Sequence, residues 1–148
     1  MSIFTKYIKQ FQNARTAFVN GDAALAAVGS MLYVAKAGGI SDKEFDAVID
    51  MMRSNPRFEG LDIDSMVAKW EGYASERMAR RDLFDLLSKI KGECDIKLLQ
   101  DVVISVIEVA DADGEEDDCE CQDNISPAEK ERIDEIGNAV GVDVDKLI

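Results

Sequence analysis

The sequence predicts an all-α protein, a compact bundle of about seven helices in a single domain that spans residues 1–148. Apolar residues recur at helical spacing along nearly the whole chain. Only residues 102–107 are β-branched enough for a buried strand, and the sequence offers no second strand to pair with them. A helix, a turn and a second helix opened by Ser-x-x-Glu occur twice, which indicates an internal helix-turn-helix duplication.

Residues 1–20 are expected to form an amphipathic N-terminal helix that ends at Asn20 and Gly21. Its charged side chains are all basic, and its aromatic side chains share another face: Phe4, Tyr7, Phe11 and Phe18. Such a helix would lie on an anionic membrane surface or pack on the bundle. Three basic charges are few for stable anchoring, which favours packing.

The next two helices form the first copy of the repeat. Asp22 is expected to cap a helix that ends at the glycines 38–39. Ser41 then caps a helix in which Glu44 completes a capping box, and residues 55–56, Asn-Pro, end it.

Two further helices are expected around the apolar stripes at residues 63–74 and 83–90, the second stopped by Gly92. Residues 98–110 are interpreted as a helix despite their β-branched centre, because their place in the repeat matches that of residues 22–37. A helix that is apolar nearly all round suits the middle of a bundle, so this one is expected to be the central helix.

The last helix closes the second copy of the repeat. Ser126 is its expected cap, with Pro127 in the first turn and Glu129 three residues after the cap. Gly141 ends this helix, and residues 142–148 form a short tail.

Composition limits the classes of function. The formal net charge of −13 argues against direct nucleic-acid binding, because neutralising phosphates requires clustered Lys and Arg. Arg77, Arg80 and Arg81 form a small basic cluster that would receive an acidic partner or this chain's own acidic run. The N-terminus does not resemble a signal peptide, and no segment is apolar enough to span a membrane, so a cytoplasmic location is expected.

The most distinctive segment is an acidic run at positions 111–123, where eight of thirteen residues are Asp or Glu. Residues 115–124 separate the turn of the second copy from its capped helix, so they form an acidic insertion loop. Hard cations such as Ca²⁺ and Mg²⁺ take several oxygen ligands, and the run therefore predicts a divalent-cation site. The alternative is a solvated acidic loop without a ligand. The candidate ligands within the insertion are Glu115, Glu116, Asp117, Asp118, Cys119 and Cys121.

The cysteines Cys119 and Cys121 would suit a soft metal or redox chemistry, but their surroundings argue against both. The chain has no histidine and only one further cysteine, Cys94, whereas a structural zinc site takes four nitrogen or sulfur ligands. Acidic neighbours raise the pKa of a thiol and so lower its thiolate fraction.

The repeated motif can be read directly from the sequence: residues 35–44 are Ala-Lys-Ala-Gly-Gly-Ile-Ser-Asp-Lys-Glu, and residues 110–114 with 125–129 are Ala-Asp-Ala-Asp-Gly and Ile-Ser-Pro-Ala-Glu. This duplicated motif resembles the TerB tellurite-resistance family. The resemblance covers roughly residues 22–148. It implies an all-helical cytoplasmic protein of tellurite resistance, stress response or phage defence, in a membrane-associated assembly with other Ter-type proteins.

The resemblance also implies that acidic residues of the two turns bind divalent metal. Asp113, with Asp111 beside it, matches the aspartate of the second Asp-Gly turn. Glu129 and Glu44 match the glutamates that open the following helices, and Asp42 accompanies Glu44. The first copy has Gly38 where the aspartate is expected, so its turn lacks a ligand.

A non-enzymatic binding module is therefore the expected function. The sequence has no histidine for general-base catalysis at neutral pH and no glycine-rich phosphate loop. Two alternatives stay open: an acidic mimic of nucleic acid, and a structural adaptor that needs no metal. A mimic would need carboxylates spread over a long face, whereas here they are concentrated in one short segment. Residues 1–20 of such a module would be able to make peripheral contact with the inner membrane.

Overall fold

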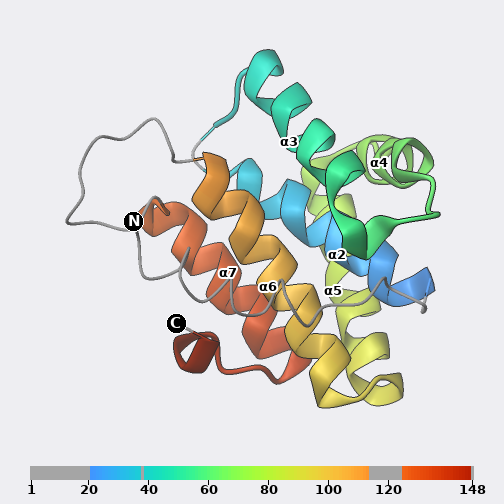
Figure 1. Cartoon of the computed structure of the whole chain (residues 1–148), viewed down its shortest axis with the longest axis vertical. Helices are drawn as coiled ribbons and strands as arrows, with labels where there is room; N and C mark the ends of the chain where they lie inside the picture. The colour runs from blue at the N-terminus through green and yellow to red at the C-terminus, as the bar shows by residue number, and fades with distance from the viewer. Residues whose placement is uncertain (1–20, 38, 114–124, 148) are drawn as a thin grey trace.

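The computed structural model describes residues 21–37, 39–113 and 125–147, except for the side chains of residues 112 and 113. These residues form six α-helices, α2 to α7, and two short 3₁₀ helices, and they contain no strand (Figure 1). The predicted all-α fold is confirmed. The expected helix at residues 1–20 and the insertion at 115–124 lie outside the described residues.

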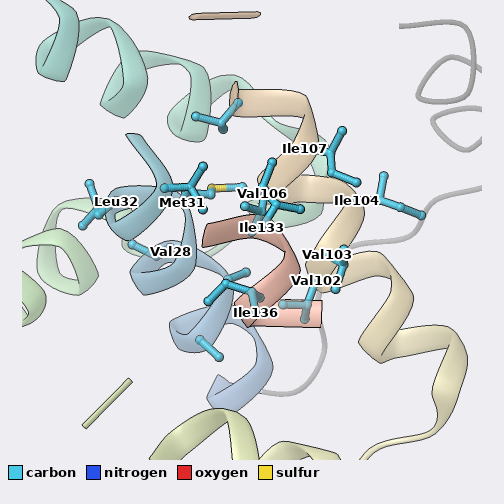
Figure 2. Close-up of a cluster of buried hydrophobic side chains, with 14 of the residues drawn as sticks. Val28, Met31, Leu32, Val102, Val103, Ile104, Val106, Ile107, Ile133 and Ile136 are labelled. Atoms are coloured by element: carbon cyan, nitrogen blue, oxygen red, sulfur yellow. The ribbon is translucent and has the colours of Figure 1, made fainter. Parts of the chain in front are cut away.

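Helices α2 (Gly21–Ala35) and α6 (Ile96–Asp113) pack against each other more extensively than any other pair of described elements. Side chains of both helices meet those of α7 in the core shown in Figure 2: Val28, Met31 and Leu32 from α2, Val102, Val103, Val106 and Ile107 from α6, and Ile133 and Ile136 from α7. The segment around residues 102–107 is thus helical and buried, as expected.

The expectation of one central helix needs correction, because α2 shares the centre with α6. Helix α2 contacts α3, α4, α5, α6 and α7. Most of its buried residues are small, among them Ala23, Ala24, Ala26, Ala27 and Gly29, which lets its neighbours approach on several sides. Asp22 also differs from its expected role as a cap: it lies in the first turn of α2 and pairs with Lys89 at 2.9 Å.

Helix α3 (Asp42–Ser54) is amphipathic and buries Val48 and Met52 against the bundle. Asn55 ends it and caps the 3₁₀ helix η1 (Pro56–Phe58) by accepting the Arg57 N–H at 3.0 Å. The predicted end of the helix at Asn-Pro is confirmed. The 3₁₀ helix that follows places Arg57 inside the protein.

Helices α4 (Ile63–Glu71) and α5 (Glu76–Glu93) begin at the caps Asp62 and Ser75. Helix α5 starts earlier than its apolar stripe indicated and runs through Gly92, so the predicted stop at this glycine is wrong. Gly92 keeps an ordinary helical conformation, and Cys94 caps the helix.

Helix α7 (Pro127–Val140) ends at Gly141, whose φ of 74° is left-handed and suits glycine. The tail then forms the 3₁₀ helix η2 (Val144–Leu147). Helices α6 and α7 lie side by side and run in opposite directions, so the end of α6 and the start of α7 flank the acidic insertion (Figure 1). None of the helices in the described ranges is long and apolar enough to cross a membrane.

Candidate functional site

The last turns of α6 carry the first carboxylate of the candidate site. Asp111 follows the buried residues Val109 and Ala110 and is itself only 5% exposed. Burying an ionised carboxylate costs free energy unless the group is paired or coordinates a metal. Asp113 is the last residue of α6, and its side chain lies outside the described part of the structure.

The first turn of α7 carries the second carboxylate. Glu129 Oε1 accepts the Ser126 N–H at 3.0 Å, and Ser126 Oγ accepts the Glu129 N–H at 3.2 Å, which completes the predicted capping box. The Glu129 side chain is only 9% exposed. Its second oxygen, Oε2, is buried and has no hydrogen-bond donor within the described ranges. A buried oxygen without a hydrogen-bond donor costs free energy of folding. The environment of this atom therefore suits a cation ligand or an acceptor of a hydrogen bond from water.

The first copy of the repeat forms the same cap at the surface. Ser41 Oγ accepts the Glu44 N–H at 3.2 Å, and Glu44 Oε1 accepts the Ser41 hydroxyl at 2.8 Å. Both Glu44 and Asp42 are exposed, so water satisfies their free oxygens. The two copies therefore share the cap and differ in burial, and among their described residues only Glu129 of the second copy has a buried carboxylate oxygen without a described donor.

Among the described residues, the predicted metal ligands do not come together as a complete site. Within residues 21–37, 39–111 and 125–147, no three Asp, Glu or Cys side chains are grouped closely enough to hold a metal ion. The insertion candidates Glu115, Glu116, Asp117, Asp118, Cys119 and Cys121 all lie outside the described residues. We call the end of α6, the insertion and the start of α7 the acidic joint. A metal site at this joint would need ligands from the insertion in addition to Asp111 and Glu129.

A buried polar cluster that the sequence interpretation missed connects η1 to α6. The Arg57 side chain is fully buried, and its Nη1 donates to Glu108 Oε1 at 2.5 Å. Asn55 Nδ2 donates to Glu108 Oε2 at 3.2 Å, and Arg57 Nη2 lies 3.7 Å from Asp101 Oδ1. Burial raises the pKa of Asp101, and the Arg57 guanidinium partly offsets this effect.

Cys94 is the free thiol among the described cysteine positions. Burial raises its pKa, and the carboxylates of Glu93, Asp95 and Asp22 raise it further. A raised pKa lowers the thiolate fraction, so Cys94 lacks the environment of a reactive cysteine.

These features define a class: a small all-helical module with two Ser-capped helix pairs and buried carboxylates flanking an acidic joint. The family model for tellurite resistance protein TerB matches residues 23–148. The chain belongs to the TerB family, which confirms the resemblance seen in its repeated motif. No curated protein and no solved structure matches the chain.

Proposed function

We propose that this chain is a non-enzymatic stress-response module that binds a divalent cation of the Ca²⁺ or Mg²⁺ class at the joint between α6 and α7. The description of its family, tellurite resistance, supports a role in tellurite resistance or a related defence. The observation that carries the cation proposal is the buried Glu129 Oε2, which has no donor within the described ranges.

The chemistry of the available ligands favours a hard cation. Asp111 precedes and Glu129 follows the acidic insertion, which contributes six further Asp or Glu residues between positions 115 and 123 and includes no histidine. Ca²⁺ takes about six to eight oxygen ligands and Mg²⁺ about six, so the run supplies the remainder. Binding would neutralise part of a charge density that otherwise repels itself.

Partner binding is the second half of the proposal. With a net charge of −13, the chain suits basic surfaces of other Ter-type proteins or of a membrane-associated complex, and direct nucleic-acid binding is not expected. Residues 1–20, which carry basic charges only, are the proposed point of contact with an inner membrane from the cytoplasmic side.

Titration calorimetry of the full chain with Ca²⁺, Mg²⁺, Mn²⁺ and Zn²⁺ tests the cation proposal. We expect saturable binding of Ca²⁺ or Mg²⁺ below about 1 mM, and its loss when residues 115–124 are deleted. No saturable heat with any of the four metals would leave the metal-independent adaptor as the better account.

A further inference from the structure

A cavity of about 290 Å³ lies between α2, α4, α5 and α7. Its floor is apolar and is formed by Gly29, Leu32, Trp70 and Leu83. Ligand pockets in proteins range from about 300 to 1,000 Å³, so this cavity has room for one small organic molecule.

The floor of the cavity is held rigidly in place. Trp70 Nε1 donates to the Leu25 carbonyl oxygen at 3.0 Å, which fixes the indole ring against α2. Gly29 makes this approach possible, because a Cβ at that position would lie 2.6 Å from Trp70 Cε2. At one wall, Tyr33 packs edge to face on Phe84 with ring centroids 5.8 Å apart. The apolar surface is thus formed before any ligand arrives.

The rim of the cavity is basic, in contrast to the chain as a whole. The lining contains Lys36, Arg77, Arg80 and Arg132 but only two carboxylates, those of Glu71 and Glu76. In a protein with a net charge of −13, this is a local excess of positive charge.

Two of the four cations already have carboxylate partners. Lys36 pairs with Glu71 at 2.7 Å, and Arg80 pairs with Glu135 at 3.2 Å. Arg77 and Arg132 pair with no carboxylate in the part of the chain that the structure describes.

Arg132 is nevertheless fixed in position at the cavity. Its Nη1 donates to the Tyr33 carbonyl oxygen at 2.6 Å, and its guanidinium carbon lies 4.4 Å from the centroid of the Tyr33 ring. A guanidinium carries five N–H donors, so Arg132 has donors beyond this single bond.

We propose that this cavity binds a small organic anion whose apolar body rests on the Trp70 and Leu83 floor and whose carboxylate, sulfonate or phosphate group is bound by Arg77 and Arg132. Guanidinium groups bind such oxyanions by charge-assisted hydrogen bonds. The small volume favours a free small molecule over a peptide segment, and the surrounding negative charge disfavours a nucleic-acid chain.

The proposal is tested with two fluorescent probes of nearly the same shape, 8-anilinonaphthalene-1-sulfonate and its uncharged analogue N-phenyl-1-naphthylamine. Binding of each probe to the full chain is measured for the parent, Arg77→Gln, Arg81→Gln and Ala79→Trp. Arg81 is the matched control, since it lies on the same helix but outside the cavity lining, where it pairs with Asp82 at 3.8 Å. Ala79 lines the cavity, so a tryptophan there would fill it.

We expect the sulfonate probe to bind one site per chain and Arg77→Gln to raise its Kd by roughly threefold to tenfold. Arg77→Gln should leave the Kd of the uncharged probe within about twofold, Arg81→Gln should affect neither probe, and Ala79→Trp should abolish binding of both. Equal effects of Arg77→Gln and Arg81→Gln on the sulfonate probe would overturn the proposal. So would unchanged binding in Ala79→Trp, because the probes would then occupy another part of the surface.

Discussion

Arg57 Nη1 donates to Glu108 Oε1 at 2.5 Å, which joins η1 to the second half of α6 through a fully buried guanidinium. We expect Arg57→Met to lower the free energy of unfolding by about 3 kcal/mol, because the variant leaves the Glu108 carboxylate buried without its cation. Chemical denaturation at neutral pH measures this loss, and a double-mutant cycle with Glu108→Gln measures the coupling between the two side chains.

The matched control for this variant is Arg53→Met. Arg53 is half-exposed and pairs with Asp50 and Asp64 at the surface. Solvent screens such pairs, so we expect little change in the free energy of unfolding. Similar losses for Arg53→Met and Arg57→Met would contradict the special role of the buried pair.

The carboxyl of Asp101 gives a prediction for the dependence of stability on pH. Burial raises its pKa in the folded protein above the unfolded value. The folded state therefore favours the protonated carboxyl, and the contribution of Asp101 to stability falls as the pH rises from about 4, the ordinary range of an aspartate, through the raised pKa.

Asp101→Asn cannot ionise, so its stability relative to the parent should increase as the pH rises through this window. Unfolding curves of both proteins at a series of pH values give the difference directly. A difference that is constant or that falls with rising pH would show that ionised Asp101 is not destabilising.

The contact between Gly29 and Trp70 predicts a sensitive position in α2. A Cβ at position 29 would lie 2.6 Å from the indole ring, which is 7% exposed and has little room to move. We expect Gly29→Ala to lower the free energy of unfolding by about 1 to 3 kcal/mol. The emission spectrum of Trp70, the one tryptophan in the chain, should shift as its ring moves.

Gly92→Ala is the matched control for this variant. A Cβ built at Gly92 has no atom within 4 Å apart from its chain neighbours and the backbone of its own helix, and the residue is helical. Alanine there should raise the free energy of unfolding by up to about 1 kcal/mol through its better helix propensity. If both alanine variants stabilise the protein, the steric account of Gly29 is wrong.

The sequence predicted the features of the fold that depend on neighbouring residues. Both capping boxes are confirmed, because a serine and a glutamate three residues later are sufficient to form them. The sequence did not predict the central position of α2. Many of the buried residues of this helix are alanine or glycine, which give a weaker apolar pattern than large side chains do. Its burial results from close packing with five other helices.

The polar interior was harder to predict. Arg57 and Glu108 are 51 residues apart in the sequence, and only the tertiary fold brings them together. The sequence of α6 does contain a signal of this polar cluster. Asp101 and Glu108 lie seven residues apart and therefore share a face of an otherwise apolar helix. The cavity likewise combines Arg77 and Arg80, which are close in sequence, with Arg132 from α7, which is not.

For the acidic joint, the sequence identified the residue types, and the structure adds the difference in burial between the two copies. Glu44 and Glu129 occupy the same place in their capping boxes, yet Glu44 is exposed and Glu129 is only 9% exposed. This difference separates a glutamate that acts only as a cap from one with a spare buried oxygen.

The affinity for Ca²⁺ of the parent, Glu129→Gln and Glu44→Gln, measured by titration calorimetry, tests the central claim most directly. Glutamine retains an oxygen that can complete the capping box but removes the charge of a cation ligand. We predict that Glu129→Gln weakens Ca²⁺ binding by at least about tenfold, while Glu44→Gln stays within about twofold of the parent. Equal affinities in all three proteins would contradict a cation site built on Glu129.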